Sequence, residues 1–160
     1  MVTTATKNRT WIWYLALVAL LTTASISTLV VFNVRQQLTA EKLDQAEARW
    51  QEKKPASYNM TFTKHIDNHS EKFTVQVRQG TVVVVELDGR PLEERQNIYY
   101  SMEALFDYVR RFLEIDAEPG KRRPYVIASF DPADGHLVRY IRSDGVQRVE
   151  LHVQELKPVE

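Results

Sequence analysis

The sequence of 160 residues contains no cysteine. That absence excludes a disulfide scaffold, a thiolate metal site and a cysteine nucleophile. An excess of charge of one sign is also lacking, because 21 lysines and arginines balance 21 aspartates and glutamates. Nucleic-acid-binding domains normally carry a basic excess, so we expect no nucleic-acid partner. The length accommodates one ordinary domain.

The N-terminal stretch 10–34 lacks charged residues altogether. A helix that spans a bilayer needs about 20 mostly apolar residues. Trp11 and Trp13 stand at one end of the stretch, and aromatic rings favour the headgroup layer. Residues 11–34 are therefore predicted to form a transmembrane helix, an uncleaved signal anchor in the lipid bilayer. Two alternatives are a signal peptide cleaved near Ser27 and a helix buried in a core.

Hydroxyl side chains are frequent in the middle of this segment. Such side chains can hydrogen-bond to a second helix in the membrane, or back to a carbonyl of their own helix. On the first interpretation, Thr23 and Ser27 are predicted to bind a partner subunit. No ionisable side chain is present, which argues against a proton or ion pathway.

The flanking charges give a preference for one orientation. Lys7 and Arg9 immediately precede the apolar stretch, whereas Arg35 alone closely follows it. Positive charge favours the cytoplasmic side. Residues 1–10 are therefore predicted to be a cytoplasmic tail, with everything after the helix exported.

The segment 35–55 is predicted to be a juxtamembrane helical stalk. Its surface is polar, with only a thin apolar line that includes Leu43, Ala46 and Trp50. Pro55 ends it, because proline disfavours a helical conformation in the residue before it. A solvated stalk is one interpretation, and a helix docked on its own domain or on a partner is the other. Trp50 is predicted to pack, and joins Thr23 and Ser27 as a partner-binding residue.

The pattern changes from helical to alternating after this segment. Tyr58–Phe62 and Phe73–Val77 alternate apolar and polar side chains, which is typical of half-buried antiparallel strands. Thr81–Leu87 is almost continuously apolar, which predicts a central strand. Further strands are expected at 125–130, 137–141 and 149–153.

One amphipathic helix is predicted over Ser101–Asp116. Met102, Phe106 and Phe112 lie on its apolar stripe, and Ser101 is a suitable N-cap. The resulting order, β-β-β-α-β-β-β, predicts an α+β fold for residues 56–160, with an antiparallel sheet and one packed helix.

Four short motifs occur in this order: Tyr58–Phe62, Val75–Val82, Ser101–Phe106 and Phe130–His136. On these motifs, residues 56–159 resemble a bacterial family of domains of unknown function, found mostly in small exported proteins and lipoproteins. The resemblance implies export and an α+β fold. It transfers no catalytic residue, because the family has no established activity.

Two groups of side chains could carry chemistry. His65, Asp67 and His69 have the residue types of a metal site, but the segment is predicted to be a solvated loop. Asp131 and Asp134 could form an acid–base pair, with Glu150 as a further carboxylate, but Asp-Pro-Ala-Asp-Gly is typical of a turn. We therefore expect no catalytic residue, no metal, no cofactor and no enzymatic activity.

The sequence thus predicts a single-pass, non-catalytic protein of the bacterial inner (cytoplasmic) membrane. Its N-terminus would lie inside and its C-terminal domain in the periplasm or outside the cell. The first hypothesis is an accessory or structural subunit of a larger membrane complex, with other membrane proteins as partners. The alternative is a free-standing envelope module that binds a small ligand or peptide on the sheet face away from Met102, Phe106 and Phe112.

Overall fold

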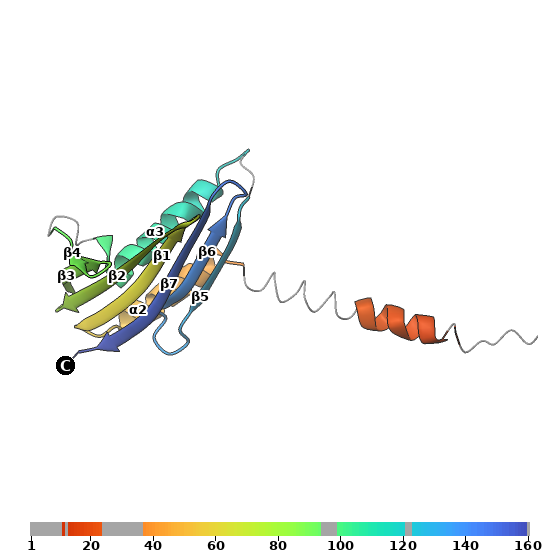
Figure 1. Cartoon of the computed structure of the whole chain (residues 1–160). Coiled ribbons are helices and arrows are strands. Elements are labelled where there is room, and N and C mark those ends of the chain that lie inside the picture. Colours follow the sequence, from red (N-terminus) through yellow and green to blue (C-terminus); the bar gives the residue numbers. More distant parts are fainter. Residues whose placement is uncertain (1–10, 12, 24–36, 94–98, 121–122, 160) are drawn as a thin grey trace, which may run out of the picture. The chain divides into compact units, whose positions relative to one another are not determined.

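The computed structural model describes residues 11, 13–23, 37–93, 99–120 and 123–159 (Figure 1). The chain divides into two compact units, residues 1–36 and residues 37–160. In the first unit, residues 11 and 13–23 are helical. No helix within the described ranges is both long and apolar enough to cross a membrane. The rest of the predicted span, and the predicted cytoplasmic tail, lie outside the described residues.

The second unit is an antiparallel sheet of seven strands with two helices packed on one face (Figure 1). The strand order across the sheet is β4-β3-β2-β1-β7-β6-β5. The elements along the chain are α2 (Ala40–Lys53), β1 (Tyr58–Ile66), β2 (His69–Arg78), β3 (Thr81–Leu87), β4 (Arg90–Pro91), α3 (Met102–Asp116), β5 (Tyr125–Phe130), β6 (Leu137–Ser143) and β7 (Arg148–Pro158). The α+β class and the antiparallel sheet are confirmed.

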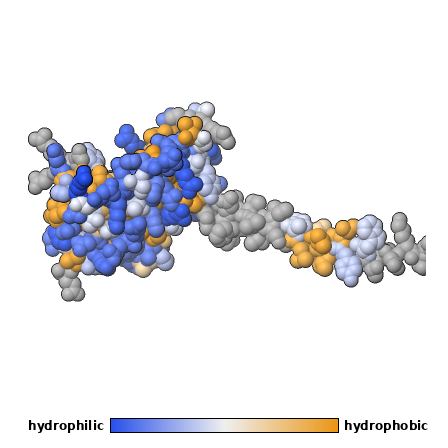
Figure 2. Space-filling view, viewed as in Figure 1, coloured by the Kyte–Doolittle hydropathy of each residue, from blue (hydrophilic) through white to orange (hydrophobic). Residues whose placement is uncertain are grey.

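The core lies between the sheet and the two helices. Alternate residues of a strand point to the same face, and most helix-facing positions are apolar and buried. They include Met60 and Phe62 of β1, Val75 of β2 and Leu151 of β7. The opposite face carries polar cross-strand pairs such as Thr61 with Thr74, and is largely hydrophilic (Figure 2). One face of the sheet is therefore buried against the helices, and the other faces solvent.

Helix α2 is part of this core and not a solvated stalk. It begins after Thr39, whose hydroxyl accepts a hydrogen bond from the Lys42 N–H as an N-cap. Leu43, Ala46 and Trp50 of its inner face are buried. The predicted boundary at 55/56 is therefore absent, because residues 37–160 form one unit. Of the two interpretations of this segment, docking on its own domain describes the structure.

Strand β3 lies near an edge of the sheet, which corrects the prediction of a central strand. Its inner neighbour is β2, and its outer neighbour β4 pairs only with Glu86 and Leu87. Val85 faces the core and is buried, whereas Val83 is 46% exposed. The run of valines is hydrophobic on both faces although only one face is covered.

Candidate functional site

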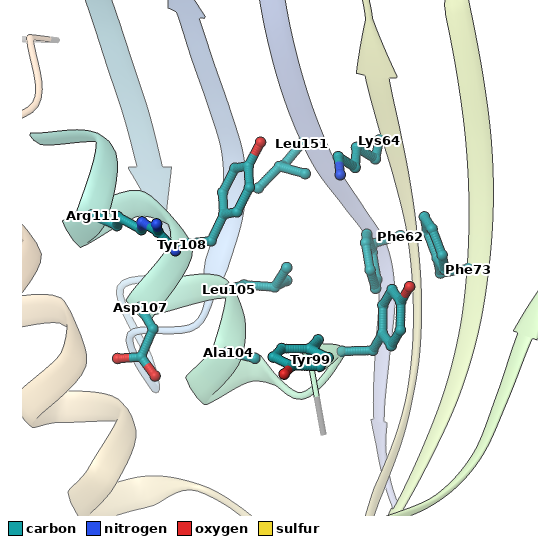
Figure 3. Close-up of a pocket in the computed structure, with 11 residues that line it drawn as sticks. Phe62, Lys64, Phe73, Tyr99, Ala104, Leu105, Asp107, Tyr108, Arg111 and Leu151 are labelled. Carbon is teal, nitrogen blue, oxygen red and sulfur yellow. The ribbon is translucent and has the colours of Figure 1, made fainter. Parts of the chain in front are cut away.

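A cleft of about 400 Å³ opens between the sheet and α3 (Figure 3). Phe62 and Lys64 of β1, Phe73 of β2 and Leu151 of β7 form the sheet wall. Their side chains share the cleft because the four positions lie on the helix-bearing face: Phe62 pairs with Phe73, and Lys64 pairs with Leu151. The sheet wall is apolar apart from one lysine.

Helix α3 supplies the second wall. Ala104 and Leu105 are consecutive, and Tyr108 lies one turn after them, so the three line the same side of the helix. In Figure 3, Leu105 and Tyr108 face Phe62 and Lys64 across the cleft. Burial raises the pKa of Tyr108 above its usual range, although the nearby charge of an arginine opposes that change. The phenol is therefore neutral at physiological pH and acts as an apolar wall with one polar tip.

A stack of three aromatic rings closes one end of the cleft. The rings of Phe62 and Phe73 have centroids 4.9 Å apart and are inclined by 16°. The rings of Phe73 and Tyr100 are also 4.9 Å apart, at 27°. Burial raises the pKa of Tyr100, and the carboxylate of Glu71 adds to the effect. Tyr99, by contrast, is largely exposed at the entrance.

Lys64 is the one charged side chain in the sheet wall of the cleft. It is half-buried, and its ammonium lies 5.5 Å from the centroid of the Tyr108 ring, within the range of a cation–π interaction. Its cross-strand neighbour Glu71 has His69 as its partner, with Nε2 and Oε1 3.5 Å apart. Within the part of the chain that the structure describes, the Lys64 ammonium has no hydrogen-bond acceptor and no ion pair.

The described lining includes no serine, histidine or paired carboxylate. Nucleophilic catalysis commonly places a serine beside a histidine, and acid–base catalysis commonly uses a histidine or two carboxylates. What the cleft offers instead is aromatic and apolar surface with the charged side chains of Lys64, Asp107 and Arg111 in its lining, which suits binding.

Residues 42–119 match the model of a family of unknown function (DUF6174). The matched range starts inside α2 and ends after α3, so it includes every lining residue of the cleft except Leu151. It begins earlier than the resemblance inferred from the sequence and ends before β5. No curated protein matches the chain.

The position of the cleft differs from the binding surface predicted from the sequence. That surface was the sheet face away from the helix stripe, but the described residues there are mostly polar, among them Thr61 and Gln76. The cleft lies beside α3 on the helix-bearing face, and Leu105 of α3 takes part in it. Lys64 was missed as well. The sequence did contain a signal for it, because Lys64 occupies the next position in the alternation of buried residues that Met60 and Phe62 begin.

Trp50 is fully buried, with an exposed fraction of 0%. Its indole N–H donates to Glu103 Oε1 at 3.2 Å, and its ring packs edge-on against Tyr58 at 5.6 Å. The prediction that it packs is correct, but the side chain has no surface exposed to a partner. Glu103 at the start of α3 also accepts from Lys54 Nζ at 2.9 Å, so this cluster joins the two helices to β1.

Thr23, in the first unit, donates its hydroxyl to the carbonyl of Ala19 at 2.7 Å. Thr22 does the same toward Val18 at 2.6 Å. These are the bonds to the own helix that the sequence left as an alternative to partner contacts. Ser27 lies outside the described residues.

The two predicted groups of chemistry-bearing residues have separate positions in the structure. Asp67 occupies a tight turn at φ 53°, where its carboxylate accepts from the Arg148 N–H at 2.8 Å. His65 and His69 do not gather with it into a metal-binding group, which holds for the described residues. Glu150 lies in β7, where it pairs with Arg139 at 2.6 Å.

Asp131 and Asp134 do come together, and His136 joins them, with one ligand atom of each within 4.8 Å of the others. The sequence analysis missed His136. The same atoms already serve the turn: Asp131 Oδ1 accepts from the Ala133 N–H at 2.7 Å, and Asp134 Oδ1 contacts His136 Nδ1 at 2.6 Å. These bonds are those expected of a turn before β6, as the sequence predicts.

Glu103→Gln tests the cluster around Trp50. Burial alone would raise the pKa of Glu103, but the hydrogen bonds from Lys54, from its own backbone N–H and from Trp50 outweigh burial and hold the pKa below its usual range. A lowered pKa means that the carboxylate stabilises the fold at neutral pH and that this stability is lost on acidification. The variant should lose about 1 kcal/mol at pH 7 and show a flatter pH dependence in acid.

Urea unfolding between pH 7 and pH 3 measures both effects. Glu114→Gln is the matched control, because Glu114 is exposed on the same helix. Equal pH profiles for the two variants would contradict a stabilising role for Glu103.

Proposed function

We propose that the domain of residues 37–160 binds a small apolar ligand in the cleft beside α3, and that the N-terminal segment holds this domain at a membrane. The cleft carries the proposal. Its volume of about 400 Å³ falls in the range of small-molecule sites, which are mostly apolar with a few polar groups. The aromatic stack of Phe62, Phe73 and Tyr100 would provide a rigid face for such a ligand.

The rigidity of the walls supports this role. Phe62 and Phe73 are 2% and 3% exposed and belong to the core, so their rings are held by the sheet. Ser101 caps α3 by accepting from the Ala104 N–H at 3.2 Å, which fixes the start of the helix wall. A ligand would enter a site that is already formed, and little ordering would oppose binding.

A substitution that fills the cleft tests the binding role. Ala104 is half-buried in the helix wall, so the indole of Ala104→Trp would occupy the space of the ligand. Binding of 4-phenylbutyrate and of its neutral amide to the full chain in lipid nanodiscs should be lost. Calorimetry or ligand-observed NMR measures it, with empty nanodiscs as the blank.

Ala48→Trp is the matched control, because Ala48 is exposed on α2, outside the cleft lining. It should bind both compounds like the unaltered chain. If neither compound binds the unaltered chain, or if Ala104→Trp binds as well as Ala48→Trp, the cleft is not the binding site.

The tether rests on the N-terminal unit. The stretch 10–34 has no charged residue, and the described helical residues expose large apolar side chains, including Trp13 and Leu20. Exposed apolar surface of this extent is unfavourable in water and favourable in lipid. The orientation proposed from Lys7 and Arg9 places the domain outside the cytoplasm of a bacterial cell. The role as an accessory or structural subunit of a membrane complex stays a prediction.

Extraction of bacterial membranes with alkaline carbonate tests the tether. The full chain should stay in the membrane pellet, and a variant lacking residues 11–34 should be released, because about 20 apolar residues are needed for stable insertion. The N-terminal sequence of the mature protein is the second measurement. A chain that begins after Ser27, or that carbonate releases, would show that the segment is no anchor.

A further inference from the structure

We infer that the cleft selects an organic anion: a small carboxylate with a planar apolar body, whose carboxylate pairs with the ammonium of Lys64. The inference rests on the proposed function, and it names the chemical class of the ligand. It follows from the position of one lysine, the charges around it and the shape of the aromatic wall.

Lys64 stands where the fold would otherwise place an apolar residue. Met60 and Phe62 precede it on the buried face of β1, and each is at most 2% exposed. Desolvating an ammonium without a partner is costly, and surface lysines avoid the cost by extending into water. Here the ammonium instead lies over the ring of Tyr108, inside the cleft (Figure 3). A carboxylate ligand would supply the acceptor that the described residues do not.

Among the charged side chains that line the cleft, Lys64 is the one that is half-buried. Asp107 and Arg111 of α3 also line the cleft, but both are exposed, so water and salt screen them. They lie four residues apart on one helix face with opposite charge, so their fields oppose each other. Glu71 stands opposite Lys64 on the same sheet face, but the two form no ion pair among the described residues, and Glu71 is outside the lining. Its Oε1 lies 3.5 Å from Nε2 of His69.

The aromatic wall selects the body of the ligand. Phe62, Phe73 and Tyr100 stack face to face with small angles between their planes, so the free ring face at an end of the stack is flat. Offset stacking on such a face favours a planar group over a bulky one. A ligand whose planar group stacks there, and whose carboxylate points to Lys64, would contact the aromatic rings and the ammonium at once.

The experiment compares two probes of nearly the same size and shape, the anionic 4-phenylbutyrate and the neutral 4-phenylbutyramide. The full chain in lipid nanodiscs should bind the carboxylate about tenfold more tightly than the amide, because a hydrogen bond to a charged group adds that much. Lys64→Met keeps an unbranched side chain only one atom shorter but removes the charge, so the two affinities should become equal. Lys64→Arg keeps the charge and should keep the preference.

Lys72→Met is the matched control. Lys72 is exposed on the adjacent strand and pairs with Thr63, on the opposite face of the sheet. Its carboxylate preference should equal that of the unaltered chain. Thermal unfolding of each variant verifies the fold, and Lys64→Arg keeps the test decisive if Lys64→Met fails to fold.

The outcomes separate this inference from the proposed function. If both probes bind equally and Ala104→Trp abolishes both, the cleft binds ligands but does not select anions, and the inference is wrong. A preference for the carboxylate that persists in Lys64→Met also overturns the inference, because another group would then bind the carboxylate. If neither probe binds, the proposed function fails with it.

Discussion

Replacing Gly135 with alanine should destabilise the domain by about 2–5 kcal/mol, because a Cβ at this position has no room. Gly135 lies in the turn before β6, and an added Cβ would come within 2.4 Å of the Ala46 carbonyl oxygen and 3.0 Å of the Trp50 N. Both atoms belong to the backbone of α2, which cannot move without shifting the helix. The φ of +85° adds strain for any residue with a side chain.

Gly120→Ala is the matched control for this prediction. Gly120 has nearly the same φ, +84°, but no atom of the described residues lies within 4 Å of its would-be Cβ. It should cost about 1–2 kcal/mol, so the difference between the two variants isolates the close approach of the turn to α2. Urea unfolding followed by circular dichroism measures both. Equal losses would mean that α2 does not pack against this turn.

This packing is also the part of the fold that the sequence left open. The spacing of Leu43, Ala46 and Trp50 indicates an amphipathic helix with a narrow apolar stripe. The stripe alone does not identify the elements that pack against it. The cover is α3, the β5–β6 turn and the sheet. Lys53 Nζ donates to the Ala133 carbonyl of that turn at 2.9 Å. The contact joins residues 80 positions apart, so no local pattern contains it.

The position of β3 was wrong for a related reason. A continuous apolar run is typical of strands covered on both faces, but Val83 of β3 is 46% exposed. Strand order depends on which segments pair over long distances, and here β7 returns to pair with β1. That return places β1 in the middle and leaves β3 near the edge. By contrast, α3 was predictable, because Ser101 and its apolar stripe act within one helix.

The cleft was not predictable as a site, although its elements were. Phe62, Phe73 and Leu151 each fit a strand pattern, and Leu105 fits the helix stripe. Their meeting around an open volume depends on how far α3 lies from the sheet, which side-chain volumes set jointly. Lys64 was the one local signal, a charge in an apolar alternation.

Replacing Arg142 with methionine should destabilise the domain by about 3–5 kcal/mol, because it leaves the buried carboxylate of Asp116 without its partner. Arg142 is 7% exposed. Its guanidinium donates to both oxygens of Asp116, at 2.8 and 2.7 Å, and to Asp144 at 3.0 Å. It also lies 4.9 Å from the centroid of the Phe112 ring. The hydrogen bonds to Asp116 raise the pKa of Arg142, so the arginine stays charged throughout.

Arg139→Met is the control on the same strand. Arg139 faces the opposite side of the sheet and pairs with Glu150 at 2.6 Å, with half of its side chain exposed. An exposed pair of this kind contributes about 0–1 kcal/mol. Urea unfolding of both variants should therefore separate a buried ion pair from an exposed one on a single strand.

A double variant distinguishes the loss of a favourable pair from the cost of an orphaned charge. In Arg142→Met with Asp116→Leu, neither partner remains charged, so much of the stability lost in Arg142→Met should return. Asp144 tolerates the change, because its carboxylate also accepts from the N–H groups of Val146 and Gln147, both at 2.9 Å. If the double variant is as unstable as Arg142→Met, the arginine acts through its packing on Phe112, and burial of the Asp116 charge is not what makes its loss costly.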